Sequence, residues 1–213
     1  MSKRLVIVGG LYGAGKSTFT KKLNVGTVIN PDEIAKKMNA RNPMRPNVIF
    51  SARRKMNQQV EKCINQGINF SIEYTFVFRQ ALRKMKRAQK KGYQITLFYV
   101  GLGDPKKNIQ RVQSRVNKGG HAIPQSVIKL GYPLSLHNFV KATKYADSVI
   151  IIDNATAYEK VLEIQNKQTV YKKNNLPDWV KKLSTKIRKI NDKPKMVFRN
   201  RRFNLRKMKR MRD

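Results

Sequence analysis

The feature that most constrains this chain is a glycine-rich loop that directly follows a short apolar segment. Residues 4–8 read RLVIV, residues 10–17 read GLYGAGKS, and helical spacing begins at Ser17. The pattern G-x4-G-K-S between a strand and a helix is typical of a phosphate-binding loop, because the glycines let backbone N–H groups converge on phosphate oxygens at the positive end of the helix. The sequence therefore predicts a P-loop at residues 10–17, and a chance glycine turn is the alternative.

The chemistry of a P-loop assigns roles to its last residues. Lys16 is expected to reach the β- and γ-phosphate oxygens of ATP, and Ser17 to ligate Mg²⁺. The other residues expected to contact the nucleotide are Gly10, Gly13, Ala14, Gly15, Thr18 and, much later in the chain, Asn154. ATP and Mg²⁺ are thus the predicted cofactors.

The rest of the chain alternates short apolar segments with segments of helical spacing. Strands are expected at residues 27–29, 68–72, 93–100 and 148–152, and helices at residues 47–65, 78–91 and 105–118. This alternation predicts an α/β fold of the P-loop NTPase type, a mostly parallel sheet flanked by helices, with a basic C-terminal extension. We expect a P-loop kinase core over residues 1–155, a hairpin and helix addition over residues 156–180, and a basic tail over residues 181–213.

The charge of the chain is far from balanced. It carries 47 Lys and Arg against 12 Asp and Glu, for a net charge of +35. A field of this size predicts an anionic partner, which is a nucleotide, a nucleic acid, an anionic membrane surface or an acidic protein. Residues 181–213 hold 15 of the basic residues and two Asp, so this tail is a candidate for nucleic-acid binding. A proteome that is lysine-rich throughout is the alternative explanation.

Cysteine usage and hydropathy bear on the compartment. Cys63 is the only cysteine, which excludes an intramolecular disulfide and favours a reducing compartment. No segment approaches the ~20 apolar residues that a transmembrane helix needs. We therefore expect a soluble, cytoplasmic protein without a transmembrane segment.

Two acidic residues follow predicted strands at the sheet edge where the P-loop lies. A kinase with a hydroxyl acceptor needs a carboxylate near the γ-phosphate, as a general base or to position the acceptor. Asp32 and Glu73 are the candidates. For Asp32 the alternative role is helix capping, and for Glu73 it is an ion pair with a nearby cation.

Arginines are expected where charge builds on the transferring phosphoryl group. Arg111 and Arg115 lie four residues apart on one face of a predicted helix that leads into Gly119 and Gly120, a possible hinge for a lid. The alternative is that both are ordinary surface cations. A late apolar strand ends at Asp153; we do not interpret it as a Walker B strand, and place this end near the nucleobase or in a structural turn.

The order of these motifs resembles the zeta toxin family of P-loop kinases. The matching segments are residues 9–18, 30–33, 73–75, 111–124 and 135–138, with Asp147, Asp153 and Asn154. The resemblance covers roughly residues 4–155. It implies a phosphotransferase that moves the γ-phosphate of ATP to a hydroxyl of a small acceptor, a UDP-N-acetylamino sugar such as UDP-N-acetylglucosamine. It also implies a small antitoxin protein as a partner that covers the nucleotide site.

The same resemblance implies roles for single residues. Asp32 would deprotonate the acceptor hydroxyl, and Glu73 and Thr75 would hold the acceptor. The residues that would stabilise the transferring phosphoryl group are Lys16, Arg111 and Arg115.

The chain departs from the family pattern where two lid arginines are usual. Gly131 and Leu134 stand at those positions. This departure keeps open a non-catalytic nucleotide-binding interaction protein. The basic tail and the basic face at Arg83–Lys91 keep open another function, a polynucleotide kinase or nucleic-acid-binding ATPase.

Overall fold

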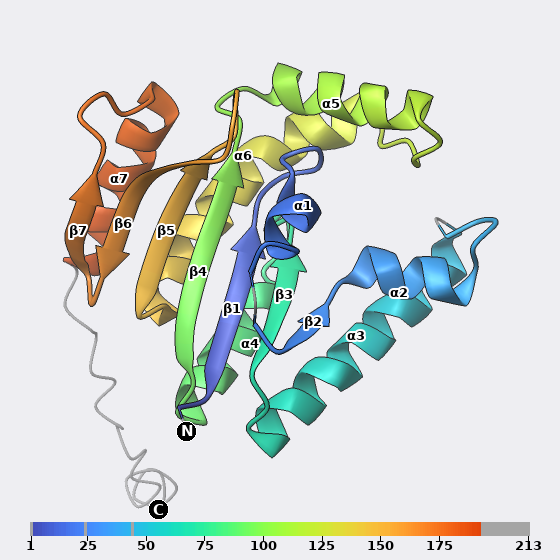
Figure 1. The fold of residues 1–213 in the computed structure, drawn as a ribbon, viewed down its shortest axis with the longest axis horizontal. Helices are drawn as coiled ribbons and strands as arrows, with labels where there is room; N and C mark the ends of the chain where they lie inside the picture. The colour runs from blue at the N-terminus through green and yellow to red at the C-terminus, as the bar shows by residue number, and fades with distance from the viewer. Residues whose placement is uncertain (1, 24, 44, 193–213) are drawn as a thin grey trace, which may run out of the picture.

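A computed structural model describes residues 2–23, 25–43 and 45–192 (Figure 1). Its strands are β1 (Arg4–Gly9), β2 (Thr27–Ile29), β3 (Phe70–Tyr74), β4 (Gln94–Gly101), β5 (Ser148–Asp153), β6 (Glu159–Gln165) and β7 (Gln168–Lys172). Its helices are α1 (Lys16–Thr20), α2 (Pro31–Met38), α3 (Pro46–Gln66), α4 (Gln80–Lys90), α5 (Pro105–Asn117), α6 (Gln125–Ala142), the 3-10 turn η1 (Thr143–Tyr145) and α7 (Asp178–Asn191).

All seven strands form one sheet, in the order β2-β3-β1-β4-β5-β6-β7. The first five in this order pair in parallel, and β6 and β7 continue the sheet as an antiparallel hairpin. The predicted α/β fold with a mostly parallel sheet flanked by helices is therefore confirmed. The carboxyl ends of the parallel strands meet at the upper edge of the sheet in Figure 1, where the P-loop also lies. Open α/β sheets bind their ligands at this edge.

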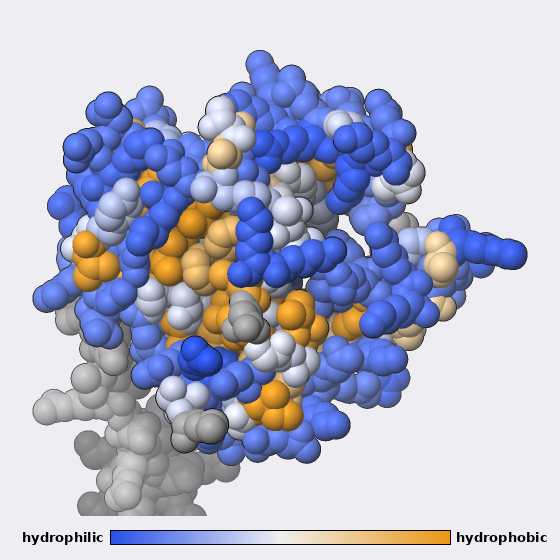
Figure 2. Space-filling view, viewed as in Figure 1, coloured by the Kyte–Doolittle hydropathy of each residue, from blue (hydrophilic) through white to orange (hydrophobic). Residues whose placement is uncertain are grey.

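Alternate residues of the central strands pack on opposite faces of the sheet. Leu5 and Ile7 of β1 belong to a large core beneath α3, α4, α6 and α7, whereas Val6 and Val8 belong to a smaller core with residues of and around α1. Because both faces are apolar, β1 reads as a continuous hydrophobic run. Figure 2 shows hydrophobic residues gathered on the face that α1 covers, where the five-residue helix leaves part of the sheet open.

Helix α6 fills a segment that the sequence left without an assigned element. It continues through Pro133, which cannot donate a helical hydrogen bond. Pro133 itself lies on the exposed side of the helix. Ile128 and Phe139 anchor the opposite side in the apolar cores, and this burial holds the helix together across the proline.

Helix α7 extends across the boundary expected between residues 180 and 181. Val180, Leu183 and Ile187 are buried in the large core, so residues 181–191 belong to the folded body. The ring of Trp179 packs on Gly101, where an added Cβ would lie 2.4 Å from it. Residues 193–213 of the predicted basic tail lie outside the described residues. Within those that are described, no helix is long and apolar enough to cross a membrane.

Candidate active site

The P-loop runs from the end of β1 to the start of α1 and passes very close to the sheet. Gly10 has φ +146°, and a Cβ there would lie 2.3 Å from the carbonyl oxygen of Val100. Gly15 has φ +94°, and a Cβ there would lie 2.6 Å from both the Asn154 amide nitrogen and the Tyr158 hydroxyl. The glycines of the motif are therefore required by a positive φ and by close packing.

Three side chains from distant parts of the chain hold the P-loop backbone. Asn108 of α5 donates to the carbonyl oxygen of Tyr12 (2.7 Å), and Asn154 after β5 donates to that of Ala14 (2.9 Å). Tyr158 donates to the carbonyl oxygen of Gly15 (2.8 Å). Asn154 was expected near the nucleotide, and the structure places it against the loop itself. Asn108 and Tyr158 were missed because no local pattern in the sequence marks them.

At the start of α1, Glu73 joins the P-loop to the end of β3. Ser17 Oγ donates to Glu73 Oε2 (2.9 Å), and Asn30 Nδ2 donates to Glu73 Oε1 (3.2 Å). Burial raises the pKa of Glu73, while Lys16 and the Ser17 hydrogen bond lower it in part. Within the described part of the chain Glu73 thus contacts a hydroxyl and an amide rather than forming an ion pair. Its carboxylate lies beside the residue expected to ligate Mg²⁺.

Lys16 lies at the base of the same cluster. Its Nζ donates to the carbonyl oxygen of Leu11 (3.1 Å). Burial lowers the pKa of the Lys16 ammonium, and the carboxylates of Glu73 and Asp32 raise it in part. A half-buried cation near two carboxylates suits a site that receives the negative charge of phosphate oxygens.

Asp32 lies in the first turn of α2. The cap of that helix is Asn30, whose Oδ1 accepts from the backbone N–H groups of Asp32 (2.9 Å) and Glu33 (3.4 Å). Helix capping therefore does not require the Asp32 side chain, which is exposed on the wall of the cleft. The carboxylate is available to a ligand.

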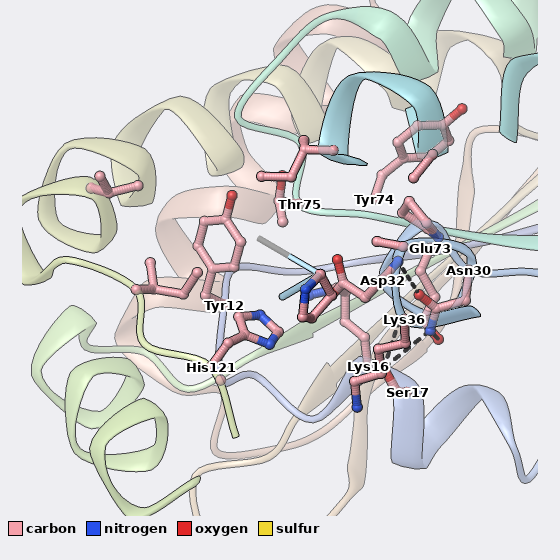
Figure 3. Close-up of a pocket in the computed structure, with 18 of the residues that line it drawn as sticks. Tyr12, Lys16, Ser17, Asn30, Asp32, Lys36, Glu73, Tyr74, Thr75 and His121 are labelled. Carbon is pink, nitrogen blue, oxygen red and sulfur yellow. Dashed lines mark hydrogen bonds between the residues drawn. The ribbon is translucent and has the colours of Figure 1, made fainter. Parts of the chain in front are cut away.

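One cleft of about 560 Å³ brings the predicted site residues together. Figure 3 shows Lys16, Asp32 and His121 pointing into it. The predicted residues along its wall are Gly13, Gly15, Lys16, Ser17, Thr18, Asp32, Glu73, Thr75, Arg111 and Arg115. Gly10, Ala14 and Asn154 do not line the cleft. Gly10 and Ala14 are buried within the P-loop, and Asn154 is buried behind it, where it donates to the carbonyl oxygen of Ala14.

The two arginines of α5 are half-buried and held by backbone carbonyls. Arg111 Nη2 donates to the carbonyl oxygen of Asn154 (2.6 Å), and Arg115 Nη2 donates to that of His121 (3.0 Å). The Nε of Arg115 is buried and has no hydrogen-bond partner in the described residues. An added Cβ at Gly120 would lie 2.6 Å from the Arg115 side chain, so the two glycines after α5 let the chain fold back over this arginine.

Helix α6 positions the segment that follows β3. Ser135 Oγ donates to the carbonyl oxygen of Thr75 (2.6 Å), and Asn138 Nδ2 donates to those of Phe76 (2.8 Å) and Val77 (3.1 Å). Phe76 has φ +58°, a left-handed conformation that is rare for a large side chain. Buried hydrogen bonds from α6 thus hold the backbone beside Thr75 in place.

The two positions where lid arginines are usual differ in their surroundings. Gly131 is buried, and a Cβ there would lie 3.2 Å from side-chain carbons of Leu11 and Val77. Helix α6 therefore packs against the P-loop at a distance that a larger residue would increase. Leu134 is exposed.

The residues present fit a magnesium ion of the kind that P-loop proteins use. Ser17 supplies a hydroxyl oxygen and Glu73 a carboxylate hydrogen-bonded to it. The described residues contain no group of three or more His, Cys, Asp and Glu that would hold a metal by themselves. Mg²⁺ commonly binds through one or two protein oxygens together with phosphate oxygens and water, and Ser17 and Glu73 offer such protein oxygens.

The fold and the site define a P-loop protein with a kinase-like arrangement: a braced phosphate loop and a carboxylate that face one cleft. Residues 5–131 match the model of the AAA domain family, and the chain belongs to that family. It is 32% identical over 135 residues to an uncharacterized protein of Haemophilus influenzae, an alignment that covers 62% of this chain and 94% of the other.

Solved structures of low sequence identity share the fold. One is a structure of the PezAT chromosomal toxin-antitoxin system of Streptococcus pneumoniae, with a TM-score of 0.59 and 13% identity over 90% of this chain and 88% of that one. Another is the AvrRxo1-ORF1:AvrRxo1-ORF2 complex with ATP, with a TM-score of 0.65 and 12% identity over 86% of this chain and 64% of that one. At these identities the likeness concerns the fold alone.

Proposed function

We propose that this protein is an ATP-dependent kinase of the zeta toxin type, and that it transfers the γ-phosphate to a hydroxyl of a UDP-N-acetylamino sugar. The observation that carries the proposal is the single cleft that holds the phosphate loop on one wall and the free carboxylate of Asp32 on another. Phosphoryl transfer to a hydroxyl needs these two elements within reach of one another.

In the proposed reaction the Asp32 carboxylate accepts the proton of the acceptor hydroxyl. The bond from that oxygen to the γ-phosphorus forms as the bond from this phosphorus to the β–γ bridging oxygen breaks, which leaves ADP. Lys16 neutralises charge on the transferring oxygens, and Arg115 supplies further positive charge; its Nε has no hydrogen-bond partner among the residues that the structure describes. Ser17 and Glu73 would hold Mg²⁺, which would supply positive charge to the phosphate oxygens.

The far wall of the cleft supports a nucleotide-sugar acceptor. Lys36 and Arg53 lie along the cleft, and both side chains are exposed, so they can neutralise a diphosphate. Thr75 offers a hydroxyl on the wall, from a backbone segment that α6 holds rigid. A charged diphosphate linked to a polar sugar suits these cations and hydroxyls better than an apolar metabolite would.

A small protein partner is part of the proposal. The PezAT and AvrRxo1 structures come from systems of two components, a toxin-antitoxin system in the first case. An acidic antitoxin would complement a chain with a net charge of +35. Inhibition of ATP turnover by the product of an adjacent reading frame is the measurement that tests this part.

The test of the activity combines an acceptor screen with one substitution. Mass spectrometry with ATP and Mg²⁺ is expected to show a gain of one phosphate on UDP-N-acetylglucosamine, and not on free sugars, nucleosides or short oligonucleotides. Asp32→Asn is expected to lower the turnover number about 10²- to 10⁴-fold while ATP still binds. Glu33→Gln, on the exposed neighbouring residue, is the matched control and should keep full activity. Wild-type turnover in Asp32→Asn would exclude the proposed base.

A further inference from the structure

A second hollow lies beside the cleft, on the outer side of α3 and the start of α4. This groove has a volume of about 640 Å³. Arg53 of α3 and Gln80 of α4 line both the groove and the cleft, so the two hollows adjoin each other. A long ligand that occupies the groove could therefore pass to the mouth of the cleft.

Two solvent-exposed phenylalanines lie near this groove. Phe50, on its wall, is 72% exposed, and Phe78, at the mouth of the cleft, is 57% exposed. The guanidinium carbon of Arg53 lies 5.6 Å from the centre of the Phe78 ring. Exposure of a large apolar ring to water is unfavourable, and aromatic rings beside arginine form the kind of surface on which unpaired bases stack.

The charges around the groove are almost all positive. Its one acidic residue, Glu61, is neutralised by Lys84 (2.7 Å) and Arg87 (2.9 Å). Within the residues that the structure describes, Arg53 and Arg54 form no ion pair, and both side chains are exposed. The outer side of α4 continues the positive surface with Arg83, Lys86 and Lys90, and α4 contains no acidic residue.

We infer that the groove between α3 and α4 binds single-stranded nucleic acid, with bases stacked on Phe50 and Phe78 and with phosphates on the arginines beside them. Amide side chains of Asn57, Gln58 and Gln80 line the groove and offer both donors and acceptors to base edges. A duplex would hide its bases from the two rings, so the surface favours unpaired strands. This binding goes beyond the proposed sugar kinase activity and does not depend on it.

The experiment uses the full chain and 3′-fluorescein oligonucleotides of about ten nucleotides, long enough to follow the ~30 Å of α3. Fluorescence anisotropy is measured with single-stranded RNA, single-stranded DNA and a duplex. The groove variant is Phe50→Ala combined with Arg54→Gln, because neither residue lines the cleft. The matched control is Tyr171→Ala combined with Lys107→Gln, an exposed aromatic residue and an exposed cation elsewhere.

The groove variant is expected to lose at least fivefold in single-strand affinity, and the control should lose less than twofold. The slope of log affinity against log salt should fall by about one in the groove variant. RNA that contains 4-thiouridine should cross-link to peptides that contain Phe50 or Phe78. Equal losses in the two variants, cross-links confined to residues 193–213, duplex binding as tight as single-strand binding, or a polyglutamate peptide that shows the same loss would each overturn the inference.

Discussion

At the scale of single residues, Glu73 is a carboxylate that the structure keeps in a buried place. Its side chain is only 6% exposed, and burial raises its pKa despite the neighbouring Lys16 and the Ser17 hydrogen bond. A carboxylate kept in such a place destabilises the protein when it is ionised. The same carboxylate holds Ser17 in position. The cost of keeping this carboxylate buried is therefore tied to the position of Ser17 in the site, and not to the packing of the core.

The pH dependence of stability should reveal this residue. A raised pKa means that the folded state holds the Glu73 proton more tightly than the unfolded chain, so stability is lost as pH rises from the unfolded value of 4.5 through the folded pKa. Glu73→Gln cannot ionise, so its midpoint of urea unfolding should match that of the wild type below pH 4.5 and exceed it at neutral pH. A gap that is widest at low pH would contradict the assignment. Ser71→Ala is the control, because Ser71 is a buried residue of the same strand and does not ionise. Any effect of this substitution on stability should be the same at every pH.

At the scale of elements, α6 links the sheet edge to the acceptor side of the cleft. Ser135 and Asn138 lie one turn apart on its buried side and together bind three consecutive carbonyls after β3. Tyr99 of β4 shares the Ser135 hydroxyl (3.0 Å), which ties the same helix to the centre of the sheet. A single helix thus holds in place the turn that presents Thr75.

Removal of the Asn138 amide should separate acceptor binding from ATP binding. Asn138→Ala leaves the carbonyls of Phe76 and Val77 without donors, at a cost of about 1–3 kcal/mol in the free energy of unfolding. The Michaelis constant for the acceptor should rise, whereas that for ATP should stay the same, because Asn108 and Asn154 still hold the P-loop. Urea unfolding and steady-state kinetics measure the two effects. His137→Ala, on the adjacent exposed residue, should change neither.

At the scale of the whole molecule, the C-terminal segments complete the body rather than extend it. The β6–β7 hairpin continues the sheet past β5, and α7 packs against the same core as α4 and α6. Trp179 fits against two glycines at the end of β4, where any side chain would collide with its ring. Folding of the P-loop core and docking of α7 are therefore expected to be one cooperative event.

Two truncations test this coupling. A chain that ends at residue 180 loses the buried side chains of Leu183 and Ile187, each worth about 1.5–3 kcal/mol. Against a typical total of ~5–15 kcal/mol, that loss should lower the melting temperature sharply or prevent folding. A chain that ends at Asp192 keeps every contact described for α7 and serves as the control. Scanning calorimetry measures both, and a fully stable chain ending at 180 would show that α7 docks independently.

The sequence alone was sufficient to predict the P-loop and the strands and helices around it. The reason is that these features depend on local patterns: glycines with a positive φ, apolar alternation, and turn residues at the ends of elements. The shared position of Asp32 and Glu73 at the cleft could also be predicted, because residues at the carboxyl ends of parallel strands meet at one edge of the sheet. The continuous helix α6 could not, since its proline masks a helix that tertiary burial sustains.

Only the tertiary structure decided what each polar group of the site contacts. Glu73 binds Ser17 and Asn30, and Asn154 holds the back of the P-loop, although 140 residues separate it from Ala14. Buried hydrogen bonds of this kind join residues far apart in the chain, so no sequence spacing encodes them. Phe50 lines the groove and Phe78 lines the cleft, and these hollows adjoin only because Arg53 of α3 and Gln80 of α4 meet in the fold. Local propensity determines the elements, and packing between distant elements determines the chemistry.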